Sequence, residues 1–149
     1  ISGMVAGQQL DIEGENTTLN IKQLETIHIN KTAKMFSASI LIPYLISNIE
    51  EKHIENALSK IAMDIGVCFQ IKDDILDVTE TSETLGKTAQ KDLAMQKSTY
   101  VSLLGLDGAK KALTQTLADI DKQLSTLRES ELNTSNLEKL TRLVVNRKH

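Results

Sequence analysis

Three aspartates, Asp73, Asp74 and Asp77, lie inside an otherwise apolar stretch at residues 67–78. Consecutive residues of an α-helix are rotated by about 100°, so these carboxylates and Gln70 would share one arc roughly 100° wide. The apolar side chains point in the remaining directions, which predicts a helix that is buried on most sides. This stretch therefore favours a fold in which other elements surround one central helix.

Carboxylates that lie this close repel one another, and burial strengthens the repulsion. A nearby cation would relieve it, and a ligand set made only of oxygens favours Mg²⁺ or Ca²⁺. The competing interpretation is an acidic face that is solvated on a surface helix, as most charge clusters are. The apolar residues on nearly every other side of the helix argue against that alternative.

The composition narrows the class of protein and of partner. A chain of 149 residues can form one domain with a buried core, and we expect a single helical domain over residues 1–149. A net charge of −3 and 3% aromatic residues argue against nucleic acid as a partner. No apolar run reaches the length of a membrane span, so we expect no membrane association. The single cysteine, Cys68, fits a reducing compartment, and we expect a cytoplasmic protein.

The spacing of apolar residues predicts an all-α helical bundle, with no alternating strand pattern of useful length. Gly7, inside an expected helix at 1–13, predicts close packing, because glycine weakens a helix by about 1 kcal/mol relative to alanine. Pro43 predicts a kink in the second helix. The remaining expectations are helices at 21–48 and 50–78, a polar loop at 79–97, a short helix at 98–104 ending at Gly105, a helix at 107–127, and a last helix that begins near Thr134 or Ser135.

An acidic strip on a buried helix, followed by a loop that carries lysines, suits a substrate that contains Mg²⁺ and diphosphate. Walker-type glycine loops and recognisable Ser-His-Asp or Cys-His patterns are absent from the sequence. We expect His28 and His53 to be packed or exposed histidines and not metal ligands. The chain starts at Ile1 without an initiator methionine, and we expect it to be an incomplete portion of a larger domain.

Several short motifs occur in a fixed order along the chain. They are Gly-Met-Val-Ala-Gly-Gln-Gln-Leu-Asp (3–11), His-Ile-Asn-Lys-Thr (28–32), Phe-Gln-Ile-Lys-Asp-Asp-Ile-Leu-Asp-Val (69–78), Leu-Gly-Lys (85–87), and Asp92 with Lys-Ser-Thr-Tyr (97–100). In order and spacing they resemble the motifs of trans-isoprenyl diphosphate synthases, most closely the bacterial farnesyl diphosphate synthase (geranyltranstransferase) group. The resemblance covers nearly the whole chain and corresponds to the C-terminal half of the isoprenoid synthase fold.

The resemblance implies roles for particular residues. Asp73, Asp74 and Asp77 match the second aspartate-rich motif, where Mg²⁺ bridges to an allylic diphosphate. Lys87 matches a lysine that contacts this diphosphate, Lys31 matches the lysine beside it, and Lys97 is a further candidate. Thr32 and Gln70 match groups whose oxygens face the allylic carbocation, and Gln8 and Asp11 match a pair that lines the same cavity. The resemblance thus implies two sets: catalytic residues Lys31, Thr32 and Gln70, and substrate-binding residues Gln8, Asp11, Lys31, Lys87 and Lys97.

The activity that the resemblance implies is prenyl transfer. Loss of diphosphate, assisted by Mg²⁺, leaves an allylic cation that alkylates isopentenyl diphosphate. Loss of a proton to the departing diphosphate then gives geranyl or farnesyl diphosphate. The resemblance also implies a homodimer. The family's first aspartate-rich motif does not occur in this sequence, so we expect the chain alone to be inactive. Three positions depart from common family residues, namely Ala33, Gln90 and Val101.

Other functions remain open at this point. The chain could be a non-catalytic helical subunit that pairs with a catalytic prenyl synthase chain, although a scaffold has no use for a full set of diphosphate-binding residues. A terpene cyclase or a squalene-type synthase is a nearer alternative, but those enzymes lack this combination of motifs. An acidic helical bundle that binds nothing would explain the composition but not the motifs.

Overall fold

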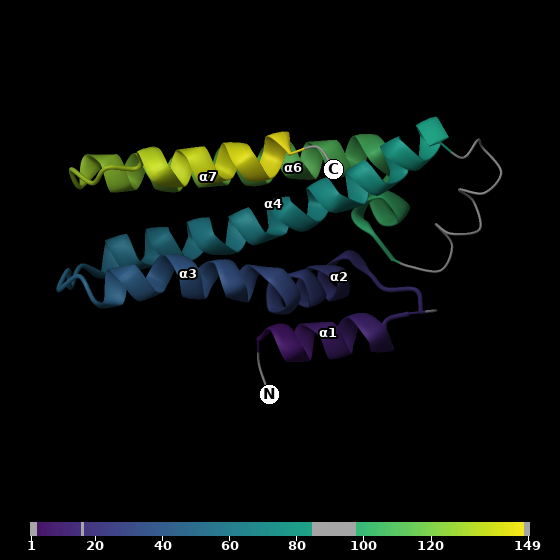
Figure 1. The fold of residues 1–149 in the computed structure, drawn as a ribbon, viewed down its shortest axis with the longest axis horizontal. Coiled ribbons are helices and arrows are strands. Elements are labelled where there is room, and N and C mark those ends of the chain that lie inside the picture. Colours follow the sequence, from purple (N-terminus) through teal and green to yellow (C-terminus); the bar gives the residue numbers. More distant parts are fainter. Residues whose placement is uncertain (1–2, 16, 85–97, 148–149) are drawn as a thin grey trace.

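The computed structural model describes residues 3–15, 17–84 and 98–147, and the side chains of all of these except 80–84. Every regular element in this part of the chain is helical, which confirms the all-α prediction (Figure 1). The elements are α1 (Met4–Glu13), α2 (Ile21–His28), the π-helical segment η1 (Ile29–Ala33), α3 (Lys34–Leu45), α4 (Lys52–Thr84), α6 (Tyr100–Glu129) and α7 (Ser135–Asn146).

Helix α4 is the central element, as the apolar spacing predicts. It has 33 residues and a length of about 50 Å, and it lies between α2 and α3 on one side and α6 and α7 on the other (Figure 1). Ile61, Ile65 and Cys68 on α4 are completely buried. Burial raises the pKa of the Cys68 thiol to about 12, so this cysteine stays a neutral core residue.

Two clusters of buried side chains follow one another along α4. Both clusters contain residues of α4 and of α6, so these two helices run through both clusters. The first consists of Tyr44, Ile54, Ala57, Ile61, Ile65, Cys68, Ile120, Leu124, Leu127 and Val144. The second consists of Leu24, Ile71, Ile75, Tyr100 and Ala109, and lies nearer the three aspartates.

Some helix ends differ from the sequence-based expectation. Helix α4 continues to Thr84, so the prediction of a loop from residue 79 is wrong for 79–84. No glycine or proline stops the helix there, and the Thr79 hydroxyl donates back to Ile75 O and Leu76 O at 3.0 and 3.2 Å. The rest of the predicted loop, 85–97, lies outside the described residues. Pro43 lies in the last turn of α3, which ends two residues later at Leu45.

The break at Gly105 is confirmed. Gly105 has φ 72° and ψ 165°, a conformation that is almost restricted to glycine, and two helical segments of α6 meet there. The first segment begins at Tyr100, where Thr99 and Ser102 form a capping box with bonds of 3.0 and 2.8 Å. Among the described residues, none of the helices combines the length and the apolar character that crossing a membrane requires.

Candidate functional site

The acidic strip lies on α4 where the sequence predicts it. Gln70 Nε2 donates to Asp73 Oδ2 at 3.4 Å, so these two side chains share a face of the helix. Ile71 and Ile75 are 1% and 6% exposed, whereas Asp77 is exposed to solvent. The helix is therefore buried on its apolar sides and polar along one side.

Asp73 is paired with a positively charged side chain that the sequence analysis missed. The guanidinium of Arg147, directly after α7, donates to Asp73 Oδ1 and to the carbonyl oxygen of Phe69, the latter at 2.9 Å. The same guanidinium lies 3.7 Å from the centre of the Phe69 ring. The two charged residues are 74 positions apart, so no local pattern could have indicated this pair.

Asp74 has a different environment from Asp73. Its Oδ2 accepts a hydrogen bond from the backbone N–H of Tyr100 at 2.7 Å, at the first residue of α6. A carboxylate at this end of a helix is stabilised by the unsatisfied N–H groups and by the helix dipole. Asp74 thus ties the central helix to the start of α6, which is a structural contact that the metal-ligand prediction does not include.

Tyr100 is packed against α2 and remains a neutral donor. Burial raises the pKa of its phenol, and the negative charge of Glu25 raises it further. The Tyr100 hydroxyl lies 3.4 Å from Glu25 Oε1, and the Tyr100 ring is 5.7 Å from that of His28. His28 is buried against Tyr100, and His53 is exposed, so one of the two expected alternatives holds for each histidine.

Lys31 lies in η1, where a π-helical segment interrupts the helix formed by α2 and α3. Its ammonium is 2.7 Å from Asp11 Oδ2 on α1, and the two side chains are 29% and 11% exposed. A Cβ added to Gly7 would lie 2.2 Å from Lys31 N, and one added to Gly66 would lie 2.4 Å from Ala33 Cα. Two glycines on neighbouring helices therefore allow α1 and α4 to approach the backbone of η1 directly.

The other predicted substrate-binding and catalytic residues differ in where they lie relative to Lys31. Thr32 is half-buried in η1 beside Lys31. Gln8 is exposed on α1, so the structure brings Asp11 but not Gln8 to Lys31. Lys87 and Lys97 lie outside the described residues.

The donor chemistry of the strip suits Mg²⁺, because each of the three predicted ligands is a carboxylate. The arrangement is less favourable. In the described part of the chain, no three histidine, cysteine, aspartate or glutamate residues are grouped so that they could hold a metal ion. Asp73 is engaged by Arg147, and Asp74 by the N–H of Tyr100. A cation at this strip would therefore have to rearrange the contacts of Asp73.

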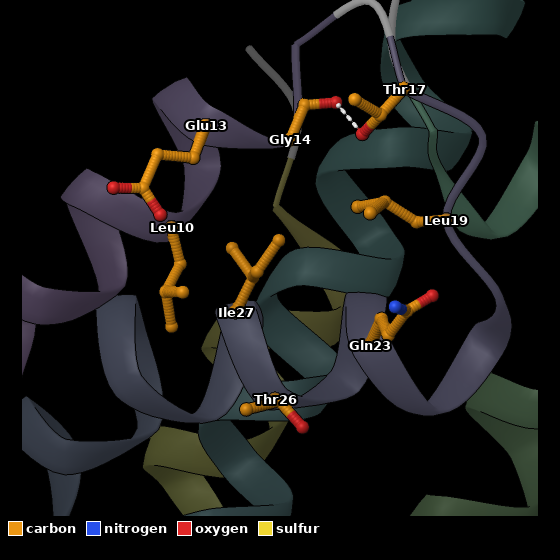
Figure 2. Close-up of a pocket in the computed structure, with 8 residues that line it drawn as sticks. All are labelled: Leu10, Glu13, Gly14, Thr17, Leu19, Gln23, Thr26 and Ile27. Carbon is orange, nitrogen blue, oxygen red and sulfur yellow. Dashed lines mark hydrogen bonds between the residues drawn. The ribbon is translucent and has the colours of Figure 1, made fainter.

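A pocket of about 250 Å³ lies away from the acidic strip, between the end of α1, the following turn and α2 (Figure 2). The Thr17 hydroxyl donates to Gly14 O at 2.8 Å and closes one rim of this pocket (Figure 2). None of the predicted site residues that the structure describes lines it. The lining residues are Leu10, Glu13, Gly14, Thr17, Leu19, Gln23, Thr26 and Ile27.

Known proteins are similar to this chain in both sequence and fold. The polyprenyl synthetase family profile matches residues 1–134. Farnesyl diphosphate synthase of Micrococcus luteus is 45% identical over 136 residues, which are 91% of this chain and 46% of that protein. Farnesyl diphosphate synthase of Escherichia coli (strain K12) is 37% identical over 147 residues, or 99% of this chain and 49% of that protein.

Solved structures agree with the sequence relatives. The crystal structure of geranyltransferase from Helicobacter pylori 26695 superimposes with a TM-score of 0.78 at 34% identity, covering 97% of this chain and 46% of that one. A second structure of the H. pylori enzyme, complexed with magnesium and isoprenyl diphosphate, gives a TM-score of 0.72 at 35% identity, with 97% and 46% covered. The chain spans about half the length of the curated relatives it matches. The similarity in sequence, motif order and helical fold shows that the chain belongs to the polyprenyl synthetase family.

Proposed function

We propose that this chain forms the part of a prenyltransferase site that binds the allylic diphosphate and faces the carbocation. The reaction is condensation of an allylic diphosphate with isopentenyl diphosphate to give geranyl or farnesyl diphosphate, with release of diphosphate and a proton. The observation that carries this proposal is the position of Lys31. Its side chain is half-buried in a π-helical turn that α1 and α4 approach closely, and α4 carries Gln70 and the acidic strip.

The side chains have complementary tasks in this proposal. The positive charge of Lys31 stabilises the charge that develops on the departing diphosphate, and Lys87 and Lys97 assist it. The oxygens of Thr32 and Gln70 face the carbocation, while Asp11, which is paired with Lys31, and the exposed Gln8 contact the substrate. The apolar sides of α4 keep water from the reactive cation.

Mg²⁺ is the cofactor that we propose, with Asp73, Asp74 and Asp77 as its ligands. When bound, it would neutralise part of the charge of the diphosphate. The carboxylate donors and the magnesium complex of the related H. pylori enzyme support this choice.

We further propose that the protein acts in the cytoplasm as a homodimer. Large apolar side chains are exposed on α1, on α3 and at the residue that directly follows α3, and exposed apolar surface favours association between subunits. They include Val5 (68%), Ile12 (58%), Met35 (54%), Ile42 (56%), Leu45 (68%) and Ile46 (76%).

Calorimetric titration of the 149-residue chain with geranyl diphosphate, in the presence of Mg²⁺, tests the substrate class. Lys31→Met should weaken binding at least about tenfold, because a charge-assisted hydrogen bond contributes about 1.5–3 kcal/mol. Lys34→Met is the matched control, since Lys34 is exposed at the start of α3 and should leave the affinity unchanged. Absence of binding by the wild type, or equal binding by Lys31→Met, would contradict the proposal.

A second assay tests turnover by the chain alone. We expect no product from dimethylallyl and isopentenyl diphosphates with Mg²⁺, because the sequence holds a single aspartate-rich motif of this kind. Robust product from a sample of verified mass would refute that expectation. Co-purification with a catalytic prenyl synthase chain, without binding of allylic diphosphate, would instead favour the non-catalytic subunit.

A further inference from the structure

Arg147 is held at the acidic strip by three contacts with α4. Its guanidinium donates to Asp73 Oδ1 and to Phe69 O, and it lies 3.7 Å from the centre of the Phe69 ring. The geometry over the ring is that of a cation–π contact. The Arg147 side chain is 23% exposed, so the contacts hold it in a defined position against the helix.

Both carboxylate oxygens of Asp73 are engaged by groups of the protein. Oδ1 accepts from Arg147, and Oδ2 accepts from Gln70 Nε2 at 3.4 Å. A divalent cation would bind through these same oxygens. Two positive charges at one carboxylate repel each other, so Arg147 and a divalent cation compete for Asp73.

We propose that Arg147 is an internal counterion that lowers the affinity of Asp73 and Asp77 for a divalent cation and is displaced when the cation binds. The inference rests on the proposed metal-binding role of the acidic strip and adds that Arg147 regulates the affinity of the strip for the cation. Asp77 is exposed one helical turn beyond Asp73, where a cation can approach from solvent. Arg147 follows α7 directly, so cation binding is linked to the docking of the end of α7 on α4.

Titration with Mn²⁺, followed by the electron paramagnetic resonance signal of the free ion, measures the competition on the whole 149-residue chain. Arg147→Gln should lower the Kd for Mn²⁺ about fivefold, which corresponds to removal of about 1 kcal/mol of competing ion pairing. Arg147→Lys retains the positive charge, and its Kd for Mn²⁺ should stay within about twofold of the wild-type value. Mg²⁺ should displace the bound Mn²⁺ from each variant.

Arg142→Gln is the matched control, because Arg142 is an exposed arginine on α7 and its removal changes the net charge equally. Its Kd should equal that of the wild type. An unchanged or higher Kd in Arg147→Gln, a gain of the same size in Arg142→Gln, or no measurable binding by wild type and Arg147→Gln alike would overturn the proposal.

Substitutions of the aspartates separate this inference from the proposed function. Asp73→Asn should abolish the gain produced by Arg147→Gln, and persistence of the gain would place the cation elsewhere. If cation binding by the wild type depends on Asp73 and Asp77 but not on Arg147, the result supports the metal site and contradicts the role of Arg147 as a counterion. If binding depends on neither aspartate, the metal site itself fails.

Amide hydrogen exchange provides a readout that does not depend on affinity. Saturating Mg²⁺ should accelerate exchange in the last turn of α7 in the wild type, because the cation displaces Arg147 from α4. The same addition should have no such effect in Arg147→Gln. Unchanged exchange in the wild type with bound Mg²⁺ would overturn the displacement.

Discussion

At the scale of single residues, the position of Lys31 depends on the absence of a side chain at Gly7. A Cβ on Gly7 would lie 2.2 Å from Lys31 N and 2.5 Å from Lys31 Cα, much closer than any real contact of this kind. Glycine at this point lets α1 touch the backbone of η1. Asp11, one turn further along α1, then reaches the Lys31 ammonium at 2.7 Å.

Gly7→Ala should therefore destabilise the protein by about 2 kcal/mol, since neither backbone can move without disturbing its helix. In an unconstrained helix the same change would stabilise by about 1 kcal/mol, so the sign of the effect is diagnostic. Urea unfolding followed by circular dichroism gives the free energy. Gln8→Ala, on the exposed side of α1, should remain within about 0.5 kcal/mol of the wild type. A more stable Gly7→Ala variant would refute the close contact.

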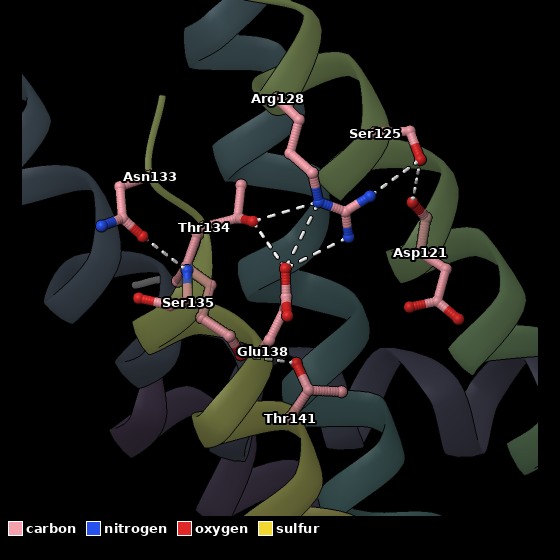
Figure 3. A network of polar contacts seen from close by, with 9 residues as sticks. Asp121, Ser125, Arg128, Asn133, Thr134, Ser135, Glu138 and Thr141 are labelled. Atoms are coloured by element: carbon pink, nitrogen blue, oxygen red, sulfur yellow. Dashed lines mark hydrogen bonds and ion pairs between the residues drawn. The ribbon is translucent and has the colours of Figure 1, made fainter. Parts of the chain in front are cut away.

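At the scale of elements, a polar network fixes the junction between α6 and α7 (Figure 3). Arg128 donates to Thr134 Oγ1 and Glu138 Oε1, each at 3.2 Å, and the Thr134 hydroxyl donates to Glu138 Oε1 at 2.6 Å. The bond from Thr134 and then the bond from Arg128 hold the pKa of Glu138 below its ordinary value. This junction sets the course of α7 and thus brings Arg147 to Asp73.

Stability should depend on pH through Glu138. A lowered pKa in the folded state contributes stability above the unfolded pKa, and that contribution is lost as pH falls through the folded value. Glu138→Gln should be less stable than the wild type at pH 7, and the difference should shrink as pH falls below the ordinary glutamate pKa. Urea unfolding at steps from pH 7 to pH 3 measures this, with Asn136→Ala as a control for loss of an exposed side chain on α7. A difference that stays constant across this range would contradict the assignment.

At the scale of the whole molecule, α4 holds the bundle together. Its residues enter both buried clusters, and it packs against α3 on one side and against α6 and α7 on the other (Figure 1). The helices on either side of α4 therefore share one core and not two independent ones.

Ile61→Ala should destabilise the entire molecule by about 3 kcal/mol, because Ile61 is 0% exposed and the substitution leaves a cavity in the buried cluster between α4 and its neighbours. Leu143→Ala, at a position that is 70% exposed, should change the stability by less than about 0.5 kcal/mol. Exchange-protected amides in α3 and in α6 should lose protection together in Ile61→Ala. Loss confined to one side of α4 would contradict a shared core.

The sequence by itself determined the features that depend on neighbouring residues. Apolar spacing predicted the buried central helix with one polar face, Gly105 the break in α6, and Gly7 a close helix contact, because each pattern spans only a few residues. The end of α4 could not be predicted in this way, since polar residues at 79–84 can continue a helix when nothing breaks it. Only the tertiary structure decided which groups meet the aspartates. Arg147 reaches Asp73 and the N–H of Tyr100 reaches Asp74 because helix packing brings distant segments together, and side-chain periodicity carries no information about that packing.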